Sequence, residues 1–283
     1  MQTLTSITDF RTAREKLRSA GSVGFVPTMG YLHDGHLELL RRARTENNVV
    51  AVSIFVNPTQ FAPAEDLATY PRDLERDQTF LEGAGCDLLF SPPVEEMYLP
   101  GGTDISVVPG KVAAVLEGAS RLGHFCGVAT VVAKLFNIVQ PERAYFGQKD
   151  GQQVVVIQRM VQDLDFPVEI VVVPTVRELD GLAMSSRNAY LNRAERAAAP
   201  ILYRALRHAQ KLHEEGERDG DALRVAMGEI VTSENLAVID YVSIADSETL
   251  AEMDHVDSSA MASVAVRIGH TRLIDNILLG SPT

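Results

Sequence analysis

Two histidines three residues apart, His33 and His36, are well suited in type and spacing to chemistry on a phosphate. They follow the short apolar run 23–27, and a helical pattern of leucines begins directly after them. Backbone N–H groups at a helix start bind anions, and two imidazoles there would contact the same anion. Gly35 between them leaves room for a nucleotide to approach the backbone. The alternative interpretation is a turn that carries two surface histidines.

A second polar segment, Met184-Ser185-Ser186-Arg187, combines two hydroxyls with a guanidinium. Such groups can hold triphosphate oxygens as negative charge develops on them. Taken alone, the segment would also fit an ordinary polar turn before a helix. The pair of segments, His-x-Gly-His first and a Met-Ser loop later, is similar to that of the nucleotidylyl-transfer superfamily, which includes class I aminoacyl-tRNA synthetases.

Further segments narrow the similarity to one family. They are 27–30 with 33–36, 53–61, 66–72, 116–118 with 123–125, 146–150 with 152–153, and 184–187. By these segments, taken in this order, the chain resembles the pantothenate synthetase family, most clearly between about residues 25 and 192, and the resemblance thins beyond them. Thr59 and Cys126 differ from the residue types common in the family, and neither is at a position expected to do chemistry.

The resemblance implies an ATP-dependent condensation of pantoate with β-alanine through a pantoyl adenylate, with release of pyrophosphate and then AMP. It implies Mg²⁺ carried on the ATP phosphates, with no direct protein ligand, and a homodimer. The catalytic residues would be His36, His33, Lys149 and Arg187. The ATP-binding residues would be Met29, Gly30, His33, Gly35, His36, Gly147, Lys149, Asp150, Val176, Met184, Ser185, Ser186 and Arg187. Gln60, Gln153, Met29 and Phe61 would bind pantoate, and Gln60, Asn57 and Tyr70 would bind β-alanine.

These assignments make electrostatic sense. A pantoate carboxylate must approach the α-phosphorus of ATP, and two anions repel unless cationic groups screen them. Gln60 and Gln153 are neutral amides with donors and acceptors, which suit a substrate with hydroxyl groups. Glu117, Arg121 and His124 resemble family positions near the site, but an ion-paired structural role fits them equally well.

Three other functions remain as alternatives. A small-molecule nucleotidylyltransferase of the same superfamily would leave the nucleotide on its product. A nucleotide-binding regulator would perform no chemistry. A tRNA-charging enzyme would bind a polyanion, which normally requires a basic face, whereas the net charge of this chain is −12. We therefore expect small-molecule substrates and no nucleic acid.

The composition is typical of a soluble enzyme, with 46% hydrophobic and 23% charged residues in a chain of 283. The N-terminal residues lack a basic and an apolar region, and no run of eighteen apolar residues occurs, so we expect neither a secretory signal nor a membrane span. The two cysteines, Cys86 and Cys126, are expected to be buried free thiols in a cytoplasmic protein.

Hydrophobic patterning predicts strands that alternate with helices up to residue 173, which is typical of a Rossmann-like parallel sheet with helices on both faces. Two helices and three strands after residue 174 predict a small C-terminal α+β domain. We expect a nucleotide- and pantoate-binding domain at 1–175 and the smaller domain, with the Met-Ser-Ser-Arg loop, at 176–283. The expected strands are 23–26, 49–56, 87–90, 144–146, 168–173, 238–244, 260–266 and 274–279. The expected helices are 8–20 (capped by Thr8 or Asp9), 36–46, 73–84, 128–139, 152–164, 194–215 and 219–232.

Overall fold

The computed structural model describes residues 1–62 and 65–280. The chain forms two compact units: unit 1 comprises residues 1–147 and 156–173, and unit 2 comprises 148–155 and 174–283. No helix in the described residues is both long enough and apolar enough to span a membrane. The predicted domain division after residue 175 stays a prediction. In the structure, the segment 148–155 groups with unit 2.

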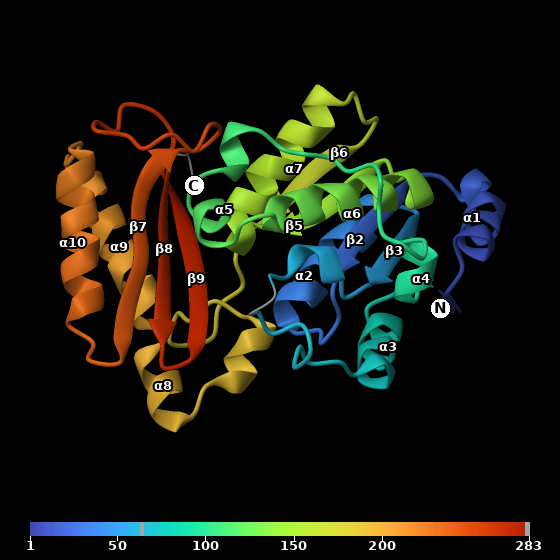
Figure 1. The fold of residues 1–283 in the computed structure, drawn as a ribbon, viewed down its shortest axis with the longest axis horizontal. Helices are drawn as coiled ribbons and strands as arrows, with labels where there is room; N and C mark the ends of the chain where they lie inside the picture. The colour runs from blue at the N-terminus through green and yellow to red at the C-terminus, as the bar shows by residue number, and fades with distance from the viewer. Residues whose placement is uncertain (63–64, 281–283) are drawn as a thin grey trace. The chain divides into compact units, whose positions relative to one another are not determined.

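A six-stranded parallel sheet forms the centre of unit 1, with strand order β1-β4-β3-β2-β5-β6 (Figure 1). The chain moves outward in one direction from β2 through β3 to β4, and then returns to place β5 on the other side of β2. Ligands of such sheets bind beyond the carboxyl ends of the strands at this switch point. The strands are β1 (Gln2–Leu4), β2 (Val23–Thr28), β3 (Val49–Ile54), β4 (Leu88–Phe90), β5 (Arg143–Gly147) and β6 (Glu169–Val173).

Helices cover both faces of this sheet, as the sequence predicts. Successive side chains of a strand point to opposite faces. Val26 and Val52 accordingly share a core cluster with residues of α2 and α3, whereas Phe90 meets Phe10 of α1, with ring centroids 5.1 Å apart. Helix α6 contacts α1 and β2. The unit 1 helices are α1 (Ile7–Lys16), α2 (Asp34–Glu46), α3 (Leu74–Gly83), α4 (Val94–Met97), α5 (Glu117–Ser120) and α6 (His124–Val139), while α7 (Gly151–Asp163) begins in unit 2.

Several details of unit 1 differ from the sequence-based expectation. Helix α1 ends at Lys16 and not at residue 20, and α6 begins at His124 and not at residue 128. The first helix begins one residue earlier, at Ile7, because Ser6 accepts a hydrogen bond from the backbone N–H of Asp9. The expected cap at Thr8 or Asp9 is therefore wrong, since both residues lie inside the first turn. Strand β1 was not expected, because three residues at a sheet edge leave almost no periodic pattern.

Unit 2 is a three-stranded antiparallel sheet, β7-β8-β9, with helices α9 and α10 packed on it (Figure 1). The expected continuous helix 194–215 is wrong. It is broken at Ala199 and Pro200, because proline has no N–H to donate and its ring clashes with the preceding turn. The elements are α8 (Arg193–Ala198), α9 (Ile201–Glu214), α10 (Gly220–Thr232), β7 (Ala237–Asp246), β8 (Ala260–Ile268) and β9 (Thr271–Leu279).

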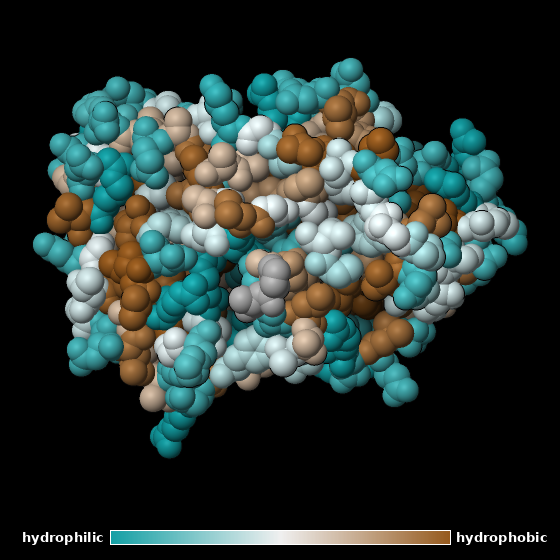
Figure 2. Space-filling view, in the orientation of Figure 1, coloured by the Kyte–Doolittle hydropathy of each residue, from teal (hydrophilic) through white to brown (hydrophobic). Residues whose placement is uncertain are grey.

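Neither cysteine forms a disulfide. Cys86 is buried, and burial raises the pKa of its thiol to about 12, so it is unreactive. Cys126 is half-buried, so the expectation of two buried thiols is correct for Cys86 alone. Figure 2 shows a surface on which hydrophilic side chains are interspersed with hydrophobic ones, as on most globular proteins.

Candidate active site

The rings of the two histidines of the His-x-Gly-His segment lie against each other at the start of α2, with their planes tilted by 36°. His33 is the N-cap of the helix, and its ring centroid lies 4.0 Å from that of His36. The backbone N–H of His33 donates to Nδ1 of His36 over 3.3 Å. Nδ1 of His36 is therefore an acceptor, and in the neutral ring Nε2 carries the proton. Gly35 lies between them in the first turn of α2.

A buried carboxylate holds the loop that joins β2 to these histidines. Both oxygens of Asp77, on α3, accept hydrogen bonds, one from the backbone N–H of Tyr31 and one from that of Leu32, each over 2.7 Å. Burial raises the pKa of Asp77, although these N–H groups oppose the shift. Gly30 has φ +83°, and a Cβ there would lie 3.1 Å from Oδ2 of Asp77 and 3.0 Å from Ile54 Cγ2. The loop therefore requires glycine and an acceptor at position 77.

Sequence reasoning missed Asp77. Its signal was a charged residue at a position that the helical period assigns to the core, because Asp77 and Leu81 lie four residues apart on the buried face of α3. A charge at such a position needs several hydrogen bonds, and here the loop provides them.

Gln60, the predicted pantoate residue, lies at the end of a short 3₁₀ turn after β3 (Pro58–Gln60). Its Oε1 accepts from Nδ2 of Asn57 over 3.0 Å, and its Nε2 lies 3.3 Å from the sulfur of Met29. Asn57 is 1% exposed, and its Oδ1 accepts from the hydroxyls of Tyr98 and Thr59. The buried Asn57 therefore orients the side-chain amide of Gln60.

The backbone of Gln60 is fixed by three residues whose roles the sequence left open or did not assign. His124, at the start of α6, lies with Nδ1 2.8 Å from the carbonyl oxygen of Gln60. Its Nε2 lies 3.0 Å from Nη1 of Arg121, and Arg121 forms a bidentate pair with Glu65 over 2.7 and 2.8 Å. Burial, followed by the charge of Arg121, lowers the pKa of His124 to about 4. The ring is therefore neutral, with its proton on Nδ1.

The helix that carries His124 approaches this turn closely. A Cβ at Gly127 would lie 2.4 Å from the carbonyl oxygen of Thr59 and 2.7 Å from the backbone nitrogen of Gln60. No side chain fits in that space, so Gly127 lets α6 rest on the turn. Phe61 and Tyr70 lie nearby in sequence and pack edge to face, with ring centroids 5.9 Å apart. Tyr70 is buried and Phe61 is half-buried.

Unit 2 carries the other predicted residues. Gly147 is the last residue of β5 in unit 1, and Lys149 and Asp150 follow in a 3₁₀ turn (Gln148–Asp150) that belongs to unit 2. Nζ of Lys149 lies 3.4 Å from Oδ1 of Asp150. Gln153 is half-buried in the first turn of α7.

The Met184–Arg187 segment begins from a short antiparallel pairing. The N–H of Met184 donates to the carbonyl oxygen of Val176 over 3.0 Å. Ser185 then caps a 3₁₀ helix (Ser186–Tyr190) by accepting from the N–H of Arg187. Ser186 is buried, and Arg187 is half-buried. The segment is thus an ordered turn with two hydroxyls and a guanidinium side by side.

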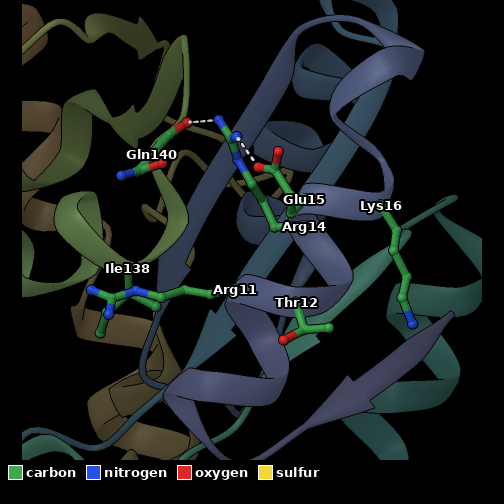
Figure 3. Close-up of a pocket in the computed structure, with 7 residues that line it drawn as sticks. All are labelled: Arg11, Thr12, Arg14, Glu15, Lys16, Ile138 and Gln140. Carbon is green, nitrogen blue, oxygen red and sulfur yellow. Dashed lines mark hydrogen bonds and ion pairs between the residues drawn. The ribbon is translucent and has the colours of Figure 1, made fainter.

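A pocket of about 660 Å³ lies in unit 1, and the arginines that line it bind backbone carbonyl groups (Figure 3). Nη2 of Arg14 donates to the carbonyl oxygen of Gln140 over 2.7 Å, and Nε donates to that of Val139 over 3.2 Å. Arg11 reaches the carbonyl oxygen of Asn137. These carbonyls form the C-terminal end of α6, which carries partial negative charge. The arginines therefore cap a helix.

Comparisons with known proteins identify the family of the chain. The family model described as pantoate-beta-alanine ligase matches residues 2–278. The chain belongs to the pantoate–β-alanine ligase family. It is 61% identical to a pantothenate synthetase of Roseiflexus castenholzii over 280 residues, and this match covers 99% of each chain.

Solved structures of family members are also similar. A pantothenate synthetase from Thermus thermophilus superposes with a TM-score of 0.93 at 51% identity, covering 98% of this chain and 99% of that one. A pantoate-beta-alanine ligase from Francisella tularensis, described as complexed with beta-gamma ATP and beta-alanine, gives a TM-score of 0.82 at 36% identity, covering 100% of this chain and 99% of that one. The predicted family and fold class are confirmed.

The predicted site residues of this pantoate–β-alanine ligase family member fall into two groups, one in each unit. In unit 1, Gln60 contacts Met29 directly, and the rings of the two histidines contact each other. Unit 2 contains the lysine turn and the Met184–Arg187 segment. Among residues 1–62 and 65–280, no group of three His, Cys, Asp or Glu side chains is placed to hold a metal ion.

Proposed function

We propose that this protein condenses pantoate with β-alanine in two ATP-dependent steps. The observation that carries the proposal is the adjacent pair of His33 and His36 at the start of α2, beyond the switch-point strand β2, in a chain of the pantoate–β-alanine ligase family. A helix start with donors of this kind suits an anionic phosphate group. The neighbouring Gln60 supplies a neutral amide for a hydroxy acid.

In the first step, a carboxylate oxygen of pantoate attacks the α-phosphorus of ATP, and the bond to the bridging oxygen of pyrophosphate breaks. The product is the mixed anhydride pantoyl adenylate. In the second step, the amine of β-alanine attacks the acyl carbon, AMP leaves with the bonding electron pair, and the amine loses a proton. A carboxylate is a poor acyl donor, and AMP is a good leaving group, so the activation makes amide formation feasible.

The cationic and donor groups have separate tasks in this proposal. Nε2–H of His36 donates to the oxygens of the α-phosphate as charge builds up on them. His33 and Lys149 screen the two anions, and Arg187 with Ser185 and Ser186 holds the β- and γ-oxygens. The remaining predicted ATP contacts are Met29, Gly30, Gly35, Gly147, Asp150, Val176 and Met184.

Gln60 and Gln153 bind the hydroxyl and carboxylate oxygens of pantoate, and Met29 and Phe61 face its methyl groups. For β-alanine, we assign Gln60 and Tyr70 to direct contact. Asn57 is buried and bonded to Gln60, Tyr98 and Thr59, which favours a role in orienting Gln60 over the direct contact predicted from sequence.

In this proposal, Mg²⁺ is bound by the phosphates of ATP. Phosphate oxygens with water suit its octahedral oxygen coordination, and the described residues offer no cluster of metal-binding side chains. The ion would neutralise phosphate charge, while His33, Lys149 and Arg187 would hold the oxygens that it leaves accessible.

We also infer a cytoplasmic homodimer, with the nucleotide and pantoate bound mainly by residues 1–175 and the Met-Ser-Ser-Arg loop supplied by 176–283. Leu99, Ile105 and Leu122 of unit 1 are 77%, 83% and 85% exposed, and a dimer interface that covered them would remove apolar surface from water. Ile105→Asp should shift the mass in sedimentation equilibrium from two chains to one.

Exchange of labelled pyrophosphate into ATP tests the proposed function. Exchange that depends on pantoate and needs no β-alanine is expected, together with a mass spectrum that contains pantoyl adenylate. Absence of exchange with pantoate would contradict the proposal and favour a nucleotide-binding regulator. If β-alanine were then added and the nucleotide remained on the product with no AMP formed, a nucleotidylyltransferase would be the better description.

A further inference from the structure

Two adjacent polar residues on β9, Asp275 and Asn276, are buried in unit 2, and neither was given a role from the sequence. Nδ2 of Asn276 donates to the carbonyl oxygens of both Gln148 and Lys149, each over 2.9 Å. Its Oδ1 accepts from Nε2 of Gln148 over 2.8 Å. The Asn276 amide therefore makes three hydrogen bonds, all to the turn that presents Lys149.

Close packing fixes the same turn from its other side. A Cβ at Gly151, the first residue of α7, would lie 2.5 Å from the sulfur of Met261 and 3.0 Å from Nδ2 of Asn276. The backbone after Lys149 thus lies directly on strands β8 and β9. A turn held by three hydrogen bonds and packed closely against the side chains of Met261 and Asn276 has little freedom to shift.

Asp275 holds the base of the other segment of unit 2 that is proposed to bind ATP, Met184–Arg187. Its two carboxylate oxygens accept from Nη1 and Nη2 of Arg177 over 2.5 and 3.0 Å. Arg177 also donates to the carbonyl oxygen of Gly181 and stacks on the ring of Tyr203 at 4.0 Å. Arg177 pairs with Ala183 in an antiparallel bridge, and the Met184–Arg187 segment follows directly.

We propose that Asp275 and Asn276 are positioning residues for adenylate formation: β9 holds the Lys149 turn and the base of the Met184–Arg187 segment as one rigid block. The inference rests on the proposed function, in which Lys149 and Arg187 contact the ATP phosphates. Asn276 acts on the nucleotide through the backbone of Lys149, and Asp275 acts through Arg177. Preorganised cations need no reorganisation when charge develops on the phosphates.

The test uses Asn276→Ala in the full-length chain. Pantoate-dependent pyrophosphate exchange should fall by about 100-fold, because a misplacement of about 1 Å can cost that factor. The KM for ATP should rise, while the KM for β-alanine should stay within twofold of that of the unmodified protein. Ser243→Ala is the matched control: it removes a buried polar group of the same sheet, one that bonds to Glu252, and should change neither KM.

A double-mutant cycle separates positioning through Lys149 from a general loss of structure. In the Lys149→Ala background, Asn276→Ala should cost less than threefold in exchange, because the side chain it positions is already absent. Additive losses in the double variant, or an unchanged KM for ATP in Asn276→Ala, would overturn the inference. If Asn276→Ala does not fold, as judged by its urea unfolding midpoint, Asn276→Ser keeps a smaller donor and goes through the same cycle with the same criteria.

Failure of the proposed function gives a different pattern. If Lys149→Ala alone retains full exchange, the assignment of Lys149 to the phosphates is wrong, and the positioning inference falls with it. If Lys149→Ala loses exchange and Asn276→Ala keeps it, the inference alone is overturned.

Discussion

His124 donates from its Nδ1 to the backbone carbonyl oxygen of Gln60 across 2.8 Å, so a helix in one part of unit 1 fixes the main chain of a proposed substrate residue in another. The donor must be His124, because a carbonyl oxygen can only accept. Arg121 then faces the unprotonated Nε2, and Glu65 balances the charge of Arg121.

We expect His124→Ala to raise the KM for pantoate about fivefold, because one lost hydrogen bond costs about 1 kcal/mol. The KM for ATP should be unchanged. His124→Asn is the control, since its amide can donate in place of Nδ1 and should restore most of the affinity. Steady-state kinetics with each substrate varied in turn measures both constants, and a change confined to ATP would contradict this role.

The lowered pKa of His124 makes stability depend on pH. The unfolded chain binds a proton at this residue below about pH 6.5, whereas the folded chain does so only near pH 4. Stability is therefore lost as the pH falls from 6.5 toward 4, by about 2 kcal/mol between pH 7 and pH 5 for this group. Urea unfolding of His124→Asn at both pH values should show a loss smaller by about that amount. Equal losses in the two proteins would refute the assignment.

Gln60→Ala and Gln153→Ala should each raise the KM for pantoate by about tenfold, before any change in the KM for ATP, because each removes an amide that bonds a substrate oxygen. Gln158→Ala is the matched control, since Gln158 is exposed on α7 and should leave both constants unchanged. The reverse order, with ATP affected first, is the result that would reject the pantoate assignment.

His36→Asn is the sharper variant at the histidine pair. Its amide oxygen can still accept from the N–H of His33, so α2 should start normally, whereas the Nε2 donor is lost. Adenylate formation should fall by about 10²- to 10⁴-fold, the usual range for an acid–base group. His255→Ala, which changes an exposed histidine, should keep full activity. Single-turnover formation of pantoyl adenylate measures the effect, and near-normal rates would remove His36 from the mechanism.

Saturating MgATP should slow tryptic cleavage after Arg187, because phosphates bound to the Arg187 guanidinium would block its recognition by the protease. Cleavage after Arg18, whose side chain is 71% exposed in unit 1, provides an internal reference that should not change. Time courses followed by mass spectrometry give both rates in one sample. Equal rates at Arg187 with and without MgATP would mean that bound nucleotide does not cover this residue.

Structural features that depend on residues adjacent in the sequence could be predicted. The step from β2 to α2 was identified, because an apolar run, glycines and a leucine period adjoin each other there. The break between α8 and α9 was not predicted, because the helical period of apolar residues continues through Pro200.

Contacts between distant residues were the part that sequence reasoning could not supply. Asp77 meets Leu32 from 45 positions away, and Asn276 meets Lys149 from 127 positions away. Their partners are backbone groups, which every residue has, so no side-chain pattern marks them. His124 was noticed but left without a role, because a carbonyl partner gives no signal in the sequence.

The neutral state of His124 has a chemical consequence for the acid that Gln60 is proposed to bind. The ring of His124 lies at the N-terminal end of α6, which carries partial positive charge, so a proton charge on the ring would be unfavourable there. The charge of Arg121 is already matched by that of Glu65. These groups around Gln60 thus add no net cation that would draw electron density away from a carboxylate. An acid held there would keep its nucleophilicity until it meets the activated phosphorus.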